Sequence, residues 1–580
     1  MKRLLGYTVL SLGMFLSSCG NTTFKSNSER LNEVIQTVDE FRSYDRSEHP
    51  LGRFEDSLRK KESDFAQKQI TVLKTIDAEQ LSETEQISLE LLKFKLQDRI
   101  DAYNFKMHHN TIQADQGFHL DLNYQVHALL SYQDARHYLD VLNDIPHFTE
   151  QQIDMLRLGI KEGIAQPKAI FKGYENSYDL HITGDAESNF FFGPFKDLPS
   201  NLTEDQKDSI LNAAEEAITK SVIPSFKRIK KFFEEEYYPN AREEIGVSST
   251  PGGKEFYQNR INFYTTTDEY TAEDIHNLGL KEVARIRKEM DMIIDEIGFK
   301  GTFEEFLQFL RTDKQFYATT GDNLLKEARN IAKKIDAQLP KFFKTLPRKP
   351  YGVIKVPDAL APKYTGGRYS GSSSNTEPGY YLVNTYKLDS RPLYILPALT
   401  AHEAVPGHHI QGSLNQELGD SIPEFRKQYY LSAYGEGWAL YTEYLADEMG
   451  IYETPYEKFG QLTYEMWRAC RLVVDTGIHA MGWTRQEAVT YLASNTALSI
   501  HEVNTETDRY IGWPGQAISY KIGELKIREL RRKAEKALGQ DFNIREFHEI
   551  ILEQGTVTLP ILERRVNEYI AKTLDERSTT

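Results

Sequence analysis

Hydrophobic residues recur every three or four positions along most of the chain, the spacing that one buried face of an α-helix requires. Segment 31–41 shows this pattern, and segment 85–105 repeats Leu and Ile at helical steps with Lys and Glu between them. We therefore expect a mainly α fold with a large multi-helix body. Residues 31–345 are predicted to form its helical scaffold.

Polar residues that favour helix N-termini mark the start of several of these helices. A Ser or Thr followed three positions later by Glu, Gln or Asp is typical of a capping box, in which two side chains satisfy the first free amides of a helix. The starts predicted in this way are Ser82, Thr149, Thr203, Thr271 and Thr302.

The pattern changes near residue 346, where Pro and Val become frequent, and segment 380–386 alternates in the manner of a strand. We expect a short β-ribbon that leads into the helix containing His402. Segment 380–386 is either an edge strand that holds an extended substrate by main-chain pairing or a stabilising hairpin. Residues 346–580 are predicted as the catalytic region. The boundary is soft, so scaffold and catalytic region could equally form one continuous domain.

The N-terminus has the features of an export signal. A basic start precedes a short apolar run at 7–15, which is too short for a permanent membrane span. The run ends in Leu-Ser-Ser-Cys19 and resembles a bacterial lipobox. We expect residues 1–19 to be a lipoprotein signal peptide, Cys19 to carry the lipid and residues 20–30 to be a tether. The alternative is an ordinary secretory signal with an incidental cysteine.

This interpretation has consequences for location and cysteine chemistry. Gly20 is not the Asp that retains lipoproteins in the inner membrane, so the outer membrane is the expected location. Of the two cysteines, Cys19 would be consumed by lipid, which leaves Cys470 without an intramolecular partner. No structural disulfide is expected.

Composition narrows the class of protein. The chain is 40% hydrophobic and 27% charged, so it can bury a core and is not disordered. Its formal net charge of -16 argues against a nucleic-acid partner, which would need a basic surface to neutralise phosphates.

Segment 401–410 (Ala-His-Glu-Ala-Val-Pro-Gly-His-His-Ile) carries the candidate chemistry, since three of the chain's 15 histidines lie in it. Catalytic zinc takes three protein ligands and keeps one position for water. The common helical solution is His-Glu-x-x-His, but here Pro406 stands where the second His is expected. Because Pro kinks a helix, the second ligand is either His408 or His409, brought inward by a bend.

Two carboxylates follow about 30 residues later. Glu436 and Glu443 are seven residues apart and so lie on one helix face. Either could supply a third ligand, while the other could orient a ligand from behind.

Four long segments resemble the bacterial domain-of-unknown-function 885 family, and the resemblance covers essentially the whole chain after the tether. The segments are Thr265-Thr-Thr, His402-Glu-Ala-Val-Pro-Gly-His-His-Ile-Gln, Glu436-Gly-Trp-Ala-Leu-Tyr-Thr-Glu and Arg509-Tyr-Ile-Gly-Trp-Pro-Gly-Gln-Ala-Ile-Ser-Tyr-Lys-Ile-Gly. Members of this family are similar to helical zinc metallopeptidases of the gluzincin type. The resemblance therefore implies a zincin-like fold with a cleft and one Zn²⁺ ion.

Carried onto this chain, the resemblance makes His402 the first ligand, His408 the second and Glu436 the third. His409 and Glu443 are the alternatives. It makes Glu403 the general base, which takes a proton from the zinc-activated water and hands it to the leaving amine.

Other residues are candidates for contacts with the substrate. His479, four residues after Asp475 on one helix face, and Tyr520 are candidate oxyanion donors. The other candidates bind substrate through a carboxylate or along the strand: Arg509, Lys521, Tyr380 and Asn384. Each could instead make a structural hydrogen bond or salt bridge.

Together these observations predict a lipid-anchored zinc metallopeptidase of the cell envelope that acts on peptides. One alternative is a zinc hydrolase of a non-peptide amide or ester, such as a cell-wall fragment. Another is a non-catalytic binding lipoprotein that kept the fold and lost the metal. The intact Glu403 argues against the last, because a binding protein has no need of a general base.

Overall fold

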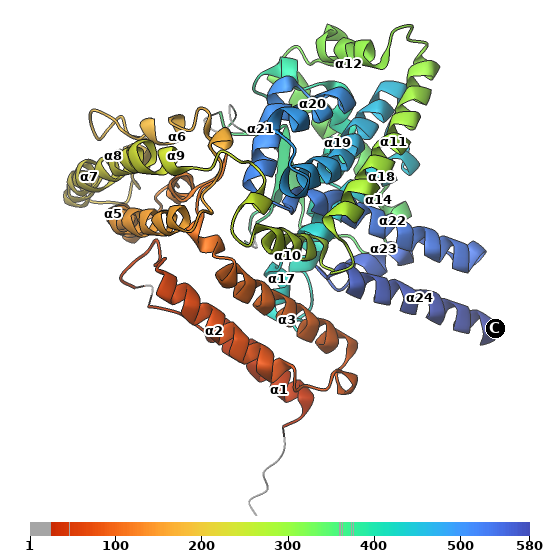
Figure 1. The fold of residues 1–580 in the computed structure, drawn as a ribbon, viewed down its shortest axis with the longest axis horizontal. Coiled ribbons are helices and arrows are strands. Elements are labelled where there is room, and N and C mark those ends of the chain that lie inside the picture. Colours follow the sequence, from red (N-terminus) through yellow and green to blue (C-terminus); the bar gives the residue numbers. More distant parts are fainter. Residues whose placement is uncertain are drawn as a thin grey trace, which may run out of the picture.

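The computed structural model describes residues 25–45, 47–358, 361, 364–372, 374 and 376–579. It confirms a mainly α fold that contains one small three-stranded sheet (Figure 1). The signal peptide and Cys19 lie outside the described residues. None of the helices in the described ranges combines the length and the apolar character needed to cross a membrane.

The first helices form a compact group at the N-terminal end, red in Figure 1. Helix α2 packs against α3, and α1 packs against both. The predicted helical segments 31–41 and 85–105 match α1 and α3 to within one residue at their C-terminal ends, but α1 begins at Asn27, inside the segment predicted as a tether. The bounds are α1 (Asn27–Glu40), α2 (Asp56–Leu73) and α3 (Glu83–Asn104).

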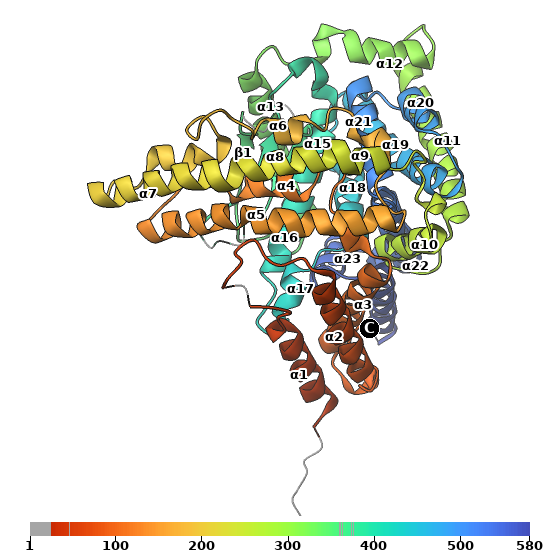
Figure 2. The same cartoon turned by 60° about the vertical axis from the view of Figure 1, so that its left-hand side comes forward.

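The next helices form an arm that stands beside the main body (Figure 2). The long α5 packs against α7 and α8. Its course corrects the predicted helix start at Thr149, which is buried inside α5. Ser131 caps the helix instead, because the turn before Thr149 is already helical and packed. The arm contains α4 (Phe118–Asp121), α5 (Tyr132–Lys161), α6 (Asn176–Asp179), α7 (Glu204–Ala217), α8 (Ile223–Phe232) and α9 (Tyr238–Asn240).

Helix α19 (Pro455–Ala480) is the centre of the main body, and every residue from Phe459 to His479 is buried. A helix that is buried on all sides must be covered by others, and α11 (Ala272–Ile297) packs along it. Scaffold and catalytic segments therefore pack directly against each other across the predicted boundary at 345/346.

Capping boxes begin four helices where the sequence predicted them, at Ser82, Thr203, Thr271 and Thr302. Other helices complete the main body with α19 and α11. They are α10 (Gly253–Thr265), α12 (Phe303–Thr312), α13 (Gly321–Asp336), α14 (Leu339–Phe342), α20 (Arg485–Asn495), α21 (Ile500–Gly512), α22 (Ser519–Leu538), α23 (Ile544–Leu552) and α24 (Leu559–Thr579).

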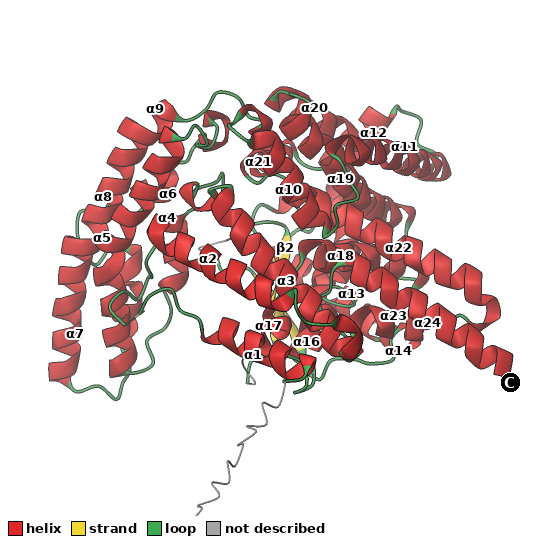
Figure 3. Ribbon diagram, turned by 60° about the horizontal axis from the view of Figure 1, so that its bottom comes forward, coloured by secondary structure: helices red, strands yellow, loops and turns green. Residues whose placement is uncertain are grey.

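The sheet lies among the helices (Figure 3) and has the strand order β1-β3-β2. Strand β3 (Gly379–Val383) is parallel to β1 (Tyr351–Lys355) and antiparallel to β2 (Gly367–Ser370). The prediction of an edge strand at 380–386 is therefore wrong, because β3 is bonded on both sides. Alternating polarity identifies a strand but not its neighbours.

Four helices after the sheet carry the candidate site. They are α15 (Leu396–Glu403), α16 (His408–Gln416), α17 (Glu424–Gln428) and α18 (Ser432–Glu448). Helix α15 packs against both β2 and α18, and α18 packs along α22. The site therefore lies where the sheet meets the central helices.

Candidate metal centre

A tight turn at 404–407 separates α15 from α16. The Val405–Pro406 peptide is cis, and the Gly407 amide donates a hydrogen bond to the Ala401 carbonyl at 2.9 Å. A Cβ atom at position 407 would lie 1.9 Å from the carbonyl oxygen of His402, so this turn requires glycine. The expected distortion by Pro-Gly is confirmed, and two short helices replace one straight helix.

The turn brings three candidate ligands together. The Nε2 atoms of His402 and His408 lie 3.4 Å and 3.5 Å from the same Oε2 atom of Glu436. The three ligand atoms lie within 4.8 Å of one another, and the two imidazole rings are nearly perpendicular. Two histidines and one carboxylate form a donor set that suits catalytic zinc.

The alternative ligand His409 points away from this cluster. Its Nε2 atom bonds the Lys349 carbonyl at 3.0 Å, and its Nδ1 atom lies 3.1 Å from the Tyr369 hydroxyl. Burial lowers its pKa to about 4. Of the two histidines that the sequence left open, the structure places His408 in the cluster and uses His409 to join α16 to the sheet.

Glu443 lies behind His402 rather than in the ligand cluster. Its Oε1 atom is 2.7 Å from Nδ1 of His402, and the carboxylate is fully buried. Since Nδ1 faces Glu443, the Nε2 atom of His402 faces Glu436. The two carboxylates of α18 thus face opposite nitrogens of the His402 ring, an arrangement that orients metal-binding histidines.

The electrostatics of the cluster favour a positive charge at its centre. Burial alone would lower the pKa of His402, but the hydrogen bonds to Glu436 and Glu443 outweigh it and raise this pKa to about 9. Burial alone would raise the pKa of Glu436, but His408 and His402 hold it well below its usual value. A carboxylate ionised at all ordinary pH values and two imidazoles are therefore a fitting donor set for a divalent cation.

Two glycines explain why Glu436 can reach this position. A Cβ atom at Gly435 would lie 2.3 Å from the Tyr430 ring, and one at Gly437 would lie 2.5 Å from Cα of Gly523 in α22. Because glycine has no Cβ atom, Tyr430 can donate to Oε1 of Glu436 at 2.9 Å, and the backbones of α18 and α22 can touch. Sequence reasoning missed Tyr430, although the glycine before Glu436 indicated that something packs there.

The candidate base Glu403 is fixed by the main chain of the sheet. Its Oε2 atom accepts a hydrogen bond from the Tyr369 amide at 2.7 Å. Tyr369 belongs to β2, one of the two edge strands, and the bond shows that this amide points away from β3. The outward carbonyl of Gly367 is also engaged, since it accepts from the Thr365 hydroxyl at 2.8 Å. Two main-chain groups on the outer side of β2 are therefore already engaged, and one of them holds the base.

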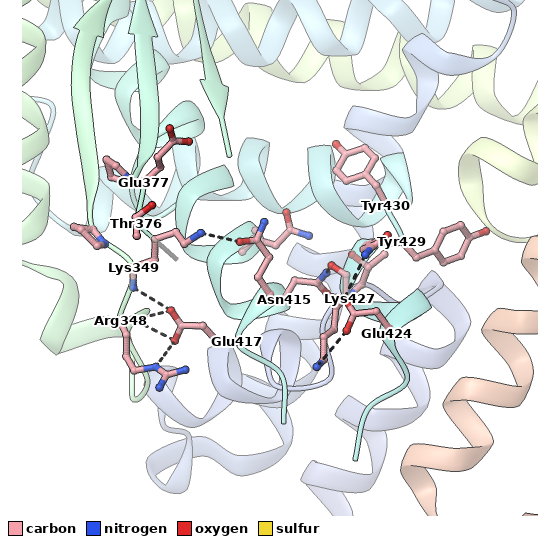
Figure 4. A pocket seen from close by; sticks show the side chains of 17 residues that line it. Arg348, Lys349, Thr376, Glu377, Asn415, Glu417, Glu424, Lys427, Tyr429 and Tyr430 are labelled. Carbon is pink, nitrogen blue, oxygen red and sulfur yellow. Dashed lines mark hydrogen bonds and ion pairs between the residues drawn. The ribbon is translucent and has the colours of Figure 1, made fainter. Parts of the chain in front are cut away.

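A cavity of about 820 Å³ is lined by Tyr430 and by residues of α16 and α17 (Figure 4). Tyr430 connects this cavity with the ligand cluster, because its hydroxyl donates to Glu436 and the residue is 49% exposed. The other walls are largely polar. Lys427 stands 3.5 Å from Glu424, and Lys349 donates to main-chain carbonyls and Gln416. Such walls suit a hydrated, polar ligand.

Three predicted substrate contacts, His479, Lys521 and Asn384, are buried and make structural contacts. His479 is fully buried, with Nε2 on the Tyr510 carbonyl at 2.9 Å and Nδ1 accepting from the Val247 amide at 3.2 Å. Burial lowers its pKa to about 4, so it stays neutral. Its neighbour Asp475 bonds the Tyr257 hydroxyl instead. Asp475 and His479 share one face of α19, but every face of this helix is buried in the core, so the shared face does not place the two residues in a substrate site.

Lys521 is also buried and is surrounded by acidic groups, with its Nζ atom 2.7 Å from Glu465, 2.9 Å from Glu524 and 3.3 Å from Glu282. It is already neutralised and does not bind a substrate carboxylate. Asn384 is buried as well, and its amide donates to the carbonyls of three loop residues, Ala361, Tyr364 and Thr365.

The remaining candidates lie closer to open space. Arg509 is held by Glu506 at 2.9 Å and Gln516 at 2.8 Å. The Tyr520 ring lies 4.3 Å from the Arg471 guanidinium, and within the described ranges its hydroxyl makes no hydrogen bond. Tyr380 lies on the central strand, half-buried between Gly352 and Ser370.

A family model described as "Bacterial protein of unknown function (DUF885)" matches residues 40–566. The chain belongs to this family. No curated protein matches this DUF885 chain, but two solved structures are similar to it. One is a predicted lipoprotein from Colwellia psychrerythraea, 26% identical, which covers 94% of this chain and all of that one with a TM-score of 0.86.

The second similar structure is a predicted lipoprotein of unknown function from Shewanella oneidensis. It is 18% identical and covers 93% of this DUF885 chain and 99% of its own, with a TM-score of 0.69. At this identity the likeness concerns the fold alone.

Proposed function

We propose that this DUF885 protein is a zinc-dependent hydrolase that cleaves peptide bonds. The observation that carries the proposal is the grouping of His402, His408 and Glu436 around one point, with Glu403 directly after the first histidine. Two histidines, a downstream glutamate and a neighbouring general base are the working parts of gluzincin-type zinc peptidases.

The roles follow from the contacts. Zinc held by His402, His408 and Glu436 would polarise a scissile carbonyl and lower the pKa of a water molecule. Glu403 takes a proton from the attacking water and delivers it to the leaving amine. The Tyr369 amide holds the Glu403 carboxylate in one orientation, and Glu443 fixes the ring of His402.

Two tyrosines have different roles in the proposed mechanism. Tyr430 is a positioning residue for Glu436 through its 2.9 Å hydrogen bond. Tyr520 has a hydroxyl with no hydrogen bond among the described residues, and the Arg471 guanidinium lies against its ring. We assign Tyr520 as the oxyanion donor.

The cavity beside the centre provides room for the peptide. Its volume of about 820 Å³ is in the range that binds a small polar molecule or a few residues of a chain. The contacts of Glu403 and Thr365 occupy two outward main-chain groups of β2, so we assign recognition chiefly to the side chains of the cavity walls.

We further propose that the protein is a lipid-anchored component of the cell envelope, at the outer membrane. The Leu-Ser-Ser-Cys19 sequence supports this, and both similar solved structures are described as lipoproteins.

The test is to measure bound zinc and the products of a mixed-peptide digest for the wild type and Glu403→Gln. We expect one zinc per chain at the centre in both proteins. Cleavage should fall about 10²–10⁴-fold in the variant, because only the base is lost. Equal cleavage by both proteins would contradict the catalytic role, and a centre that binds no zinc would contradict the metal assignment. Activity on amides or esters but not on peptides would overturn the substrate class.

A further inference from the structure

A second group of potential metal ligands lies far along the chain from the first. Asp56 begins α2, and His108 and His109 lie in a 3₁₀ turn, Met107–His109, directly after α3. Lys106 precedes this turn with a left-handed backbone (φ 55°). This conformation is uncommon for a residue with a side chain, and it turns both histidines toward the start of α2.

We propose that Asp56, His108 and His109 form a second site for a divalent transition metal. The Nε2 atom of His108 lies 2.8 Å from Oδ1 of Asp56, and the Nε2 atom of His109 lies 3.3 Å from the same oxygen. The three ligand atoms lie within 4.8 Å of one another. Two imidazoles and one carboxylate suit Zn²⁺ and its late first-row neighbours rather than Mg²⁺ or Ca²⁺, which prefer all-oxygen sites.

A carboxylate behind His109 strengthens the assignment. Oε2 of Glu162 lies 2.9 Å from Nδ1 of His109, and Lys106 holds the other Glu162 oxygen at 2.6 Å. Glu162 therefore orients the ring so that the Nε2 atom of His109 faces the Asp56 carboxylate, as a metal ligand requires. A carboxylate behind a ligating histidine, on the nitrogen opposite the metal, is the usual arrangement at metal sites. His402 stands in the same relation between Glu443 and Glu436.

Burial and access fit a bound ion that can exchange with solvent. The side chain of His109 is 4% exposed and that of His108 is 13% exposed, whereas Asp56 is 43% exposed. His108 also lines a cavity of about 920 Å³ together with Tyr103 and Arg59. The histidines are thus held in place by their surroundings, while the Asp56 side stays open to water as a further ligand.

The position of the site indicates a structural effect. Asp56 belongs to α2, the histidines follow α3, and Glu162 is the C-terminal cap of α5. A metal ion at Asp56 would tie the N-terminal helices to the arm. Because it would bind the folded chain and not the unfolded one, it would raise the melting temperature.

The experiment uses the full chain carrying His402→Gln and His408→Gln, which removes two ligands of the first centre. Titration with Zn²⁺, and with Co²⁺ for its absorption spectrum, should show one remaining equivalent and a rise in melting temperature. Adding His109→Gln should abolish both. The matched control, His127→Gln, changes an exposed histidine that pairs with Asp134 and should leave both unchanged.

Absence of micromolar binding in the double variant would overturn the proposal, as would binding that survives His109→Gln. If a variant fails to fold by circular dichroism, Asp56→Asn in the wild-type chain replaces it. This change at an exposed carboxylate should lower the number of bound zinc equivalents by one relative to the wild type, and an unchanged number would contradict the site. The outcome does not depend on the proposed hydrolase, since it is read from metal binding and stability alone.

Discussion

The Nδ1 atom of His402 lies 2.7 Å from the buried Oε1 atom of Glu443, 41 residues further along the chain. The contact sets the orientation of the first candidate ligand. It also separates the two carboxylates of α18, because Glu436 faces the cluster and Glu443 supports it from behind. The supporting carboxylate is as specific a feature of the centre as the ligands themselves.

Replacing Glu443 by Gln should weaken zinc binding about 10–100-fold. The amide of Gln can donate to Nδ1 of His402, which would move the ring proton to the nitrogen that faces the metal. Affinity is measured by competition with a chelator of known strength. Glu448→Gln on the same helix, which loses a surface pair with Arg531, should bind zinc normally. Equal losses in the two variants would contradict this role.

Tyr430→Phe should weaken zinc binding about tenfold or more, because a hydrogen bond to a charged group contributes about 1.5–3 kcal/mol. Glu436 would lose the hydroxyl that now lies at 2.9 Å. Tyr429→Phe is the matched control, since the buried Tyr429 hydroxyl has no hydrogen-bond partner among the described residues. An unchanged affinity in Tyr430→Phe would show that Glu436 is positioned without it.

Tyr369→Pro should lower kcat/KM about 10–100-fold while zinc content stays the same. Proline removes the amide that orients Glu403, and strand pairing should survive because this amide points away from β3. Tyr369→Phe keeps the amide and should retain most activity. If both variants lose activity equally, the hydroxyl, which both lack, matters rather than the amide.

Gly407→Ala should abolish zinc binding at the first centre, because the added methyl group would lie 1.9 Å from the His402 carbonyl oxygen and 2.6 Å from that of Ala401. The turn that brings His408 back to His402 could not close. Gly412→Ala is the matched control and should still bind zinc. The atom nearest to its added methyl group would be 3.7 Å away, and Ala stabilises a helix by about 1 kcal/mol relative to Gly. Zinc retained by Gly407→Ala would show that the turn is not needed.

Asp475→Asn should make stability less dependent on pH. Burial raises the pKa of Asp475 to about 7, whereas an unfolded Asp titrates near pH 4. Between about pH 4 and 7 the folded state keeps a proton that the unfolded state has lost, so stability falls as pH rises through this window. Melting temperatures from pH 4 to 8 should fall less steeply in the variant.

Glu502, whose pKa burial also raises to about 7, still titrates in Asp475→Asn, so the slope should be reduced and not eliminated. An identical pH profile for wild type and Asp475→Asn would show that Asp475 is ionised throughout. The substitution preserves an oxygen that can accept from Tyr257 and from the Gly515 amide, so folding should be retained.

Much of the helical fold could be predicted because its signals are local. The capping boxes at Ser82 and Thr271 involve residues three positions apart, and they open helices where predicted. Thr149 shows the limit of this inference, because the same pattern inside a helix is overridden by the turn that precedes it. The bend at Pro406-Gly407 could also be predicted, because proline cannot continue a straight helix.

The parts of the site that were missed depend on contacts between distant segments. The Tyr369 amide reaches Glu403 only because β2 forms the edge of the sheet, which strand polarity does not reveal. Lys521 carries the positive charge that a substrate carboxylate would need, but it lies among Glu282, Glu465 and Glu524. A charge in a sequence does not show whether its partner is a ligand or another part of the chain.

The contact of Gly437 with Gly523 has a consequence for the order in which the protein matures. Helix α18 carries both Glu436 and Glu443, and its backbone rests directly on α22. The positions of these carboxylates are thus fixed by the packing of two long helices and not by an ion. Small zinc domains are unfolded until metal arrives, whereas the helix packing here would hold the proposed ligands in place before any metal binds.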